Sequence, residues 1–364
     1  MSSLPRVNTI KSISSDLFKE RNLKRLVEKF KKSSEIDRFR TKHGIYEEAV
    51  HRLAVKKKFQ WIEEILEHQK TFKDISKEGF TVRLISLYGK SGMFEHAVKV
   101  FDEMPDLKCE RSIKSFNALL GACADSKKYD KIDEYFRGLS SKLSIKPDLI
   151  SYNTVIKAYR DMGSLDSASL MLDEMEKNGI EPDLITFNTL LHGFYENNRF
   201  DDGEKLWARM EEKNVIPDVS SYRSRLHGLV NGKRMSDAVE LVEKLQKYGP
   251  KPDVICYNAL IKGFCNDGKL EEAQKWHKEL VQKGCVPNKY TFGPFVKLLC
   301  EKCEFDKALE MCIESINHRS LMGAALLQQV VDGLVKTSKS EEAKKLVELG
   351  WSNNYSHTSL KMPS

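Results

Sequence analysis

The chain has 364 residues, of which 60 are Lys or Arg and 53 are Asp or Glu, and its formal net charge is +7. A charged fraction of 31% and a hydrophobic fraction of 40% exclude wholesale disorder, and no run approaches the roughly 18 apolar residues that a transmembrane helix needs. Eight Cys residues in this length indicate no disulfide framework, which fits a reducing compartment. The length alone would predict two globular domains.

The positive charge is concentrated at the amino end of the chain. Residues 1–77 hold 19 Lys and Arg against 11 Asp and Glu, a net charge of +8, whereas residues 78–364 are nearly neutral. Residues 1–15 have two basic residues, five serines and no acid, which fits an organellar transit peptide and equally a disordered start or a processed mature end. Residues 17–31 are predicted to be helical and to form a cap or a degenerate first repeat.

A period of 35 residues organises the rest of the chain. Pro-Asp occurs at 147–148, 182–183, 217–218 and 252–253, and Pro-Asn follows at 287–288, so that each pair lies 35 residues after the one before. Weaker copies begin at residues 43, 78, 113 and 324, and the copy over 113–148 is one residue longer than the rest. About eight units fit, and nine if the amino-terminal helical segment counts. We therefore expect a basic segment over 1–42, a repeat array over 43–358 and a short tail over 359–364.

Each unit is predicted to fold as two helices. In the unit 254–288, apolar residues at helical spacing predict one amphipathic helix through Tyr257 and Phe264 and a second through Leu270 and Leu280. The Asn-Asp-Gly sequence at 266–268 predicts the turn between them. Neither helix can bury its apolar stripe inside one unit, whereas stacked neighbours can. The sequence therefore predicts an all-α stack with one continuous core rather than two globular domains.

These features resemble the pentatricopeptide repeat family, in particular its P class. The resemblance rests on the 35-residue period, on Tyr-Asn near the start of the first helix, on Glu-Glu-Ala in the second helix and on Gly-x-x-Pro-Asp at the end of the unit. It implies an all-α, right-handed superhelical solenoid of about eight to nine 35-residue helix-turn-helix repeats. The tetratricopeptide repeat, usually a peptide-binding scaffold, is the nearest alternative, but its period is about 34 residues and its sequence pattern differs.

The resemblance implies that each repeat binds one base of single-stranded RNA, selected mainly by the fifth and the last residue of the unit. These pairs are Asn117 with Asp148, Asn153 with Asp183, Asn188 with Asp218, Arg223 with Asp253, and Asn258 with Asn288. An Asn amide offers both a donor and an acceptor to a base edge, and the family's recognition code assigns U to Asn/Asp and a pyrimidine to Asn/Asn. Arg223 fits no standard pair. Since Asn near a helix start and Asp after Pro are also good capping and turn residues, capping alone is the alternative.

Two further sets of residues fall in register with these pairs. The second residue of a unit is expected to flank a base with an apolar or aromatic surface; these residues are Ile150, Ile185, Ile255 and Tyr290. The ninth residue of a unit lies four residues beyond the fifth and on the same face of the helix. We expect these residues either to contact phosphates or only to form a solvated polar face; they are Lys157, His192, His227, Lys262 and Lys297. The amino-terminal lysines Lys56, Lys57 and Lys58 are further candidates for phosphate contact.

No pattern in the sequence predicts catalysis, a cofactor or a metal site. Cys300 and Cys303, with Cys312 nearby, resemble half a zinc site, but no second ligand pair follows, and Cys265 occupies the slot of Cys300 one repeat earlier. Small buried thiols are the favoured interpretation. The sequence has no phosphate-binding Gly-rich loop and no nucleophile–base pattern. In the family, catalysis comes with appended domains, for which the tail is too short, so we expect neither an enzyme nor a small-molecule substrate.

Residues 52–66, 77–80, 92–94 and 207–210 resemble a plant subgroup associated with the small subunit of the mitochondrial ribosome. The resemblance implies a non-catalytic RNA-binding protein of plant mitochondria, acting in translation, that contacts ribosomal RNA and mitochondrial ribosomal proteins. One alternative is a sequence-specific factor for the stability, processing or translation of an organellar transcript. A further alternative is a tetratricopeptide-like protein-interaction scaffold. We expect the mitochondrial matrix, with the chloroplast as the alternative, and no membrane association.

Overall fold

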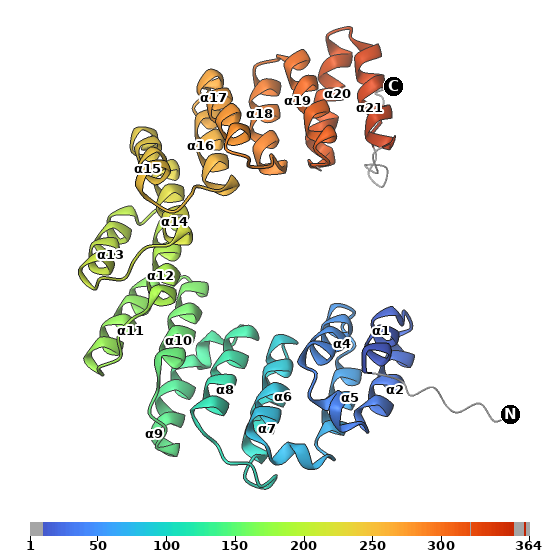
Figure 1. The fold of residues 1–364 in the computed structure, drawn as a ribbon, viewed down its shortest axis with the longest axis vertical. Coiled ribbons are helices and arrows are strands. Elements are labelled where there is room, and N and C mark those ends of the chain that lie inside the picture. The colour runs from blue at the N-terminus through green and yellow to red at the C-terminus, as the bar shows by residue number, and fades with distance from the viewer. Residues whose placement is uncertain (1–9, 321, 353–359, 362–364) are drawn as a thin grey trace, which may run out of the picture. The chain divides into compact units, whose positions relative to one another are not determined.

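The computed structural model describes residues 10–320, 322–352 and 360–361, and every regular element in these ranges is helical (Figure 1). None of the described helices is long and apolar enough to cross a membrane. Contacts divide the chain into two compact units, the first ending at Leu190 and the second beginning at Leu191. This differs from the single array predicted over 43–358. Because a repeat touches only its neighbours, contacts are sparse across any section of such an array, and here the division falls inside one helix.

The first unit is built of successive helices joined by short turns. They are α1 (Ile10–Lys19), α2 (Leu23–Ser34), α3 (Asp37–Arg40), α4 (His43–Val55), α5 (Phe59–Gln69), the 3-10 helix η1 (Lys73–Ser76), α6 (Glu78–Lys90), α7 (Phe94–Glu103), α8 (Ile113–Asp125), the 3-10 helix η2 (Tyr129–Lys131), the π-helix η3 (Glu134–Leu139), α9 (Ser140–Leu143), α10 (Leu149–Asp161), α11 (Leu165–Lys177) and α12 (Leu184–Glu196), which runs into the second unit.

The second unit continues the alternation of first and second helices. Its further helices are α13 (Phe200–Glu212), α14 (Val219–Asn231), α15 (Met235–Tyr248), α16 (Val254–Asn266), α17 (Leu270–Gln282), α18 (Lys289–Glu301), α19 (Phe305–Asn317), α20 (Ala324–Lys336) and α21 (Ser340–Ser352). From His43 onward the described helices form nine pairs, one more than the eight full units expected from the sequence.

The predicted amphipathic helices are confirmed in the unit 254–288. Helix α16 packs against its own partner α17 and against α14 and α18, the first helices of the neighbouring repeats. Tyr257, Leu260 and Ile261 are buried on α16, and Trp276 is buried on α17. Burying a side chain of this size contributes roughly 1.5–3 kcal/mol, so the stacking of repeats provides the burial that one unit lacks.

The segment predicted as one helical stretch over 17–31 contains a break. Asn22 lies between α1 and α2, and its Oδ1 accepts hydrogen bonds from the backbone N–H groups of Lys24 and Arg25 at 3.0 and 3.1 Å. An Asn at this position satisfies N–H groups that have no partner within the helix. The chain therefore starts α2 anew instead of continuing α1.

The extra residue of the unit 113–148 is absorbed in its second helix. Where other units have one regular second helix, this unit has η2, η3 and α9 in succession. A π-helix makes i→i+5 hydrogen bonds and so accommodates an inserted residue without shifting the register of the flanking turns. The segment ends at Ser144, which adopts a left-handed conformation with φ of 53°.

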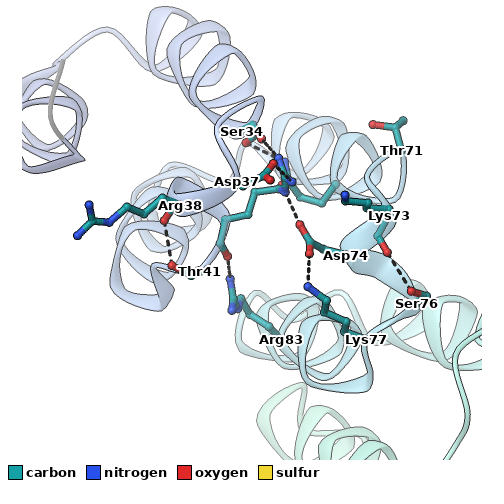
Figure 2. A network of polar contacts seen from close by, with 12 residues as sticks. Ser34, Asp37, Arg38, Thr41, Thr71, Lys73, Asp74, Ser76, Lys77 and Arg83 are labelled. Atoms are coloured by element: carbon teal, nitrogen blue, oxygen red, sulfur yellow. Dashed lines mark hydrogen bonds and ion pairs between the residues drawn. The ribbon is translucent and has the colours of Figure 1, made fainter. Parts of the chain in front are cut away.

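A network of polar contacts that includes Asp37, Asp74 and Lys77 joins the amino-terminal helices to the first repeat (Figure 2). Arg40, at the end of α3, donates to Asp74 Oδ2 on η1 at 2.7 Å, to Asp37 Oδ1 at 2.6 Å and to the carbonyl of Ser34 at 2.7 Å. Lys77 lies 2.7 Å from the other oxygen of Asp74. Hydrogen bonds from Lys77 and Arg40 hold the pKa of Asp74 below its usual value. Each nitrogen of the buried guanidinium thus donates one hydrogen bond, and two of the acceptors are carboxylates, as burial of a charge requires.

The described part of the predicted tail is attached to α20. Leu360 is buried, and the backbone of Lys361 exchanges two hydrogen bonds with the Gln328 side chain, at 3.0 and 2.8 Å.

Candidate nucleic-acid interface

Within each unit, the structure brings together fifth and last residues that the sequence pairs. The Nδ2 group of Asn117 on α8 donates to Asp148 Oδ1 at 2.9 Å, and that of Asn153 on α10 donates to Asp183 Oδ1 at 3.2 Å. Because a carboxylate only accepts hydrogen bonds, it fixes which end of the amide faces it. The residues are therefore coupled pairs rather than independent positions.

Two other predicted pairs lie in the second unit. Asn258 on α16 donates from Nδ2 to Asn288 Oδ1 at 3.2 Å. Its side chain is only 7% exposed, which leaves less of this amide open than at the half-buried Asn117 and Asn153. Arg223 on α14 forms an ion pair with Asp253, in which Nε and Nη2 of the guanidinium donate to the two carboxylate oxygens.

The same last residues also cap the next helix, as the capping alternative expects. Asp148 Oδ1 accepts from the backbone N–H of Ser151 at 3.0 Å, and Asp183 Oδ1 accepts from that of Thr186 at 2.9 Å. Asp218 caps α14 in the same way, while Asn188 lies on α12. Burial alone would raise the pKa of Asp148, but the hydrogen bonds from its neighbours outweigh it and leave the pKa lowered. Capping and amide orientation are thus two uses of one carboxylate.

A third partner in each cluster was missed in the sequence interpretation. The hydroxyl of the third residue of the following repeat donates to the amide oxygen of the fifth residue. The distances are 2.5 Å from Ser151 to Asn117, 2.6 Å from Thr186 to Asn153 and 2.7 Å from Thr291 to Asn258. The recurrence of Ser or Thr three residues after the Pro-Asp or Pro-Asn pair was the available signal. We call this arrangement of amide, last residue and hydroxyl the polar triad.

The polar triad leaves each amide half occupied. One hydrogen of Nδ2 and one lone pair of Oδ1 are used within the protein, and one of each remains. An amide whose orientation is fixed offers a base edge a defined donor and a defined acceptor, without the entropy cost of ordering a free side chain on binding.

The residues predicted to flank bases project into solvent. Ile150, Ile185, Ile255 and Tyr290 are 60%, 63%, 51% and 65% exposed, although each lies in the first turn of a well-packed helix. Large apolar side chains at such exposure suit contact with flat apolar ligands. Three of these residues, Ile150, Ile185 and Ile255, thus lie about one turn before an Asn amide, whereas the residue in this place before Asn117 is a lysine and Tyr290 precedes a glycine.

The predicted row of phosphate contacts is uneven in charge. Lys157 and Lys262 are exposed and have no ion-pair partner within the part of the chain described. The Nδ1 atom of His192 lies 3.3 Å from Oε2 of Glu196. The Nζ atom of Lys297 lies 3.9 Å from Oε1 of Glu301, one turn further along the helix. His227 is exposed, and its partial desolvation together with the nearby Lys262 lowers the pKa of its imidazole. Only part of this row therefore carries positive charge available to a phosphate.

The lysines at 56–58 lie in the turn between α4 and α5. All three are exposed, and Lys57 has a left-handed backbone with φ of 53°. The ammonium of Lys58 lies 5.5 Å from the centre of the Trp61 ring. The turn presents its positive charge without a compensating carboxylate among the described residues.

The cysteines agree only in part with the interpretation as small buried thiols. Cys265 and Cys312 are buried, Cys300 is half-buried and Cys303 is exposed. Burial raises the pKa of the Cys265 thiol to about 12, which removes the thiolate that nucleophilic or metal chemistry needs. Within the described ranges, no three His, Cys, Asp or Glu side chains are grouped to hold a metal ion.

Comparison with known proteins decides the family. The PPR repeat family model matches residues 147–196, 182–231, 224–266 and 252–301, and a PPR repeat model matches residues 83–109. The chain belongs to the pentatricopeptide repeat family. This membership removes the tetratricopeptide alternative and confirms the fold that the sequence predicted.

Several relatives of this pentatricopeptide repeat protein come from Arabidopsis thaliana. The chain is 56% identical over 169 residues to small ribosomal subunit protein mS78 (rPPR3a), covering 46% of this chain and 42% of that protein. It is 52% identical over 160 residues to small ribosomal subunit protein mS79 (rPPR3b), covering 44% and 41%. A mitochondrial pentatricopeptide repeat-containing protein is 42% identical over 134 residues, covering 37% and 34%. The matches thus span less than half the length of these relatives.

Solved structures agree on the fold. The crystal structure of the pentatricopeptide repeat protein PPR10 from maize gives a TM-score of 0.55 at 18% identity, covering 98% of this chain and 60% of that chain. PPR10 in complex with an 18-nt psaJ RNA element gives a TM-score of 0.51 at 20% identity, covering 99% and 57%. At this identity the likeness establishes the architecture alone.

Proposed function

We propose that this pentatricopeptide repeat protein binds single-stranded or ribosomal RNA through its first helices, without catalysis, as a component of the small mitochondrial ribosomal subunit. The observation that carries RNA binding is the recurrence of the polar triad beside an exposed apolar residue. In the repeats of Asn153 and Asn258 it combines a half-occupied amide with an exposed isoleucine one turn earlier. A base needs both of these, one for its edge and one for its face.

The ribosomal assignment is supported by the relatives. The chain is more than half identical over its matched length to two proteins named as small ribosomal subunit proteins. A further relative is named as mitochondrial, which supports the matrix as the location. Mitochondrial ribosomal proteins are the expected protein partners.

A second candidate function is that of a factor specific for one organellar transcript. It is favoured by the polar triads of Asn117 and Asn153, which present successive amides in the form that suits U in the family's recognition code. Too few repeats carry such pairs to select one transcript from many, which is why the ribosomal role is the leading proposal.

One experiment separates these candidates. The tagged full chain is expressed in plant cells, organelle extracts are sedimented, and crosslinked RNA is sequenced from each fraction. A ribosomal component should sediment with the small subunit and yield mainly ribosomal RNA. A transcript factor should yield one messenger footprint away from the subunit, and an absence of RNA crosslinks would reject both.

A further inference from the structure

The repeat over 219–253 departs from its neighbours in two positions whose side chains line the same cavity. Its fifth residue is Arg223 instead of Asn, and the following repeat supplies Cys256 where the others supply Ser or Thr. Arginine has no acceptor atom, so a hydroxyl in this slot could not donate to the fifth residue as Ser151 donates to Asn117. The two changes therefore form one coherent variant of the polar triad.

Arg223 is held in a fixed orientation. Its Nε donates to Asp253 Oδ1 at 3.2 Å, and its Nη2 donates to Asp253 Oδ2. This side-on contact uses two of the five N–H groups of the guanidinium and leaves both on Nη1 and one on Nη2. The remaining Nη1–H and Nη2–H groups form a planar fork at the end of the side chain. Asp253 thus orders the fork before any ligand arrives.

The fork lies beside a cavity. Arg223 lines a hollow of about 340 Å³ in the second unit, together with His192, His227, Ile255 and Ala259. This volume lies within the range of small-ligand sites. Ile255, half exposed on one wall, offers an apolar surface for the face of a planar ligand.

The charge of the pair argues for a base rather than a phosphate. Arg223 and Asp253 together are neutral, and the carboxylate repels a phosphate that approaches the fork. The cavity therefore suits an uncharged planar group with acceptors at its edge.

Resting on the proposed RNA binding, we infer that the repeat over 219–253 selects a base with two adjacent acceptor atoms and rejects uracil and adenine. Guanine presents such a pair at O6 and N7, and cytosine presents one at O2 and N3. In uracil the carbonyl oxygens O2 and O4 are separated by the N3–H donor. In adenine the acceptors N1 and N7 each lie next to the N6 amino donor, so neither edge offers two adjacent acceptors. A two-point contact of this kind discriminates between bases by about tenfold or more.

The test uses the purified full chain and short oligouridines that carry one central G, C, A or 7-deazaguanosine. Fluorescence anisotropy should show about tenfold tighter binding of the G or the C oligomer than of the all-U oligomer. Loss of the advantage on replacing G by 7-deazaguanosine assigns guanine through N7, and an advantage for C alone assigns cytosine. Equal affinity for all oligomers, or a preference for A, overturns the inference while leaving RNA binding intact. No binding to any oligomer rejects the proposed function as well.

Two variants check that Arg223 is the cause. Arg223→Asn combined with Cys256→Ser rebuilds the triad found at Asn117, and it should prefer the all-U oligomer with an unchanged salt dependence. The control is Arg234→Asn, because Nε and Nη2 of Arg234 lie 2.7 and 2.6 Å from Oδ2 of Asp237, in an ion pair that does not line this cavity. The control should keep the wild-type preference. If both variants lose it equally, Arg223 does not select the base.

Discussion

Replacing Thr186 by Val tests the polar triad within the first unit. Thr186 is fully buried, and its hydroxyl donates to Asn153 Oδ1 at 2.6 Å and accepts from the backbone N–H of Asp183 at 3.2 Å. Valine keeps the shape of the side chain but leaves both partner groups unsatisfied. An unsatisfied buried polar group costs about 1–3 kcal/mol, so the free energy of unfolding should fall by about 2 kcal/mol. The Asn153 amide also loses its fixed orientation, and the preference for U at this repeat should weaken.

The matched control is Thr189→Val, one turn further along α12. Its hydroxyl donates to the carbonyl of Ile185 at 2.7 Å on the exposed side of the helix, where substitutions usually change stability by less than about 0.5 kcal/mol. Urea unfolding followed by circular dichroism compares the two variants, and anisotropy with U-rich and C-rich oligomers compares their selectivity. The reasoning is refuted if Thr186→Val is as stable and as selective as Thr189→Val.

Three other substitutions test separate parts of the account. Replacing the lysines at 56–58 by Gln should lower RNA affinity and reduce the slope of log K against log salt by up to about 2, because each single-strand phosphate contact contributes roughly 0.7. Asp74→Asn should cost about 3 kcal/mol, because it removes a partner of the buried Arg40. The lowered pKa of Asp74 means that its stabilisation is present above the unfolded value near 3.8 and is lost as pH falls through the folded value, so this variant should lose that part of the acid sensitivity. Gly333→Ala should cost about 1–3 kcal/mol, because the added Cβ would lie 2.0 Å from a ring atom of Phe305.

Each of these has its own measurement and control. The lysine variant is compared in a salt titration with Gln at the exposed lysines 275, 278 and 283, and an equal change in slope would contradict a specific role. Asp74→Asn is followed by urea unfolding across the acid range, where an acid profile like that of wild type would contradict the assignment. Gly333→Ala is compared with Gly293→Ala, whose added Cβ would meet nothing within 4 Å; similar stability of the two would contradict the packing argument.

The elements of this fold follow from the sequence because the repeat supplies many copies of one pattern. Apolar spacing located helices such as α16 and α17 without reference to their neighbours, and the resemblance to a known family paired Asn153 with Asp183. What the repeat does not encode was harder to predict. The break at Asn22 lies outside the repeats, and the inserted residue of the unit 113–148 offered no sign of where it would be absorbed.

The polar triad shows a different limit of sequence interpretation. Asn153 and Thr186 are 33 residues apart, and only the stacking of successive repeats brings them within hydrogen-bonding distance. Likewise, the sequence placed His227 in a row of candidate cations, whereas partial desolvation and the nearby Lys262 lower its pKa and disfavour the charged form. Properties that arise between repeats depend on packing, and the spacing along the chain does not contain them.

The central claim is that RNA contacts the first helices of the repeats, in addition to the basic amino-terminal segment. Ultraviolet crosslinking of the full chain to U-rich RNA, followed by mass spectrometry of the crosslinked peptides, tests it most directly. The account predicts crosslinks in the peptides that contain Ile150, Ile185, Ile255 and Tyr290, at 35-residue intervals where repeats are contiguous. Crosslinks confined to residues 1–77 would contradict it.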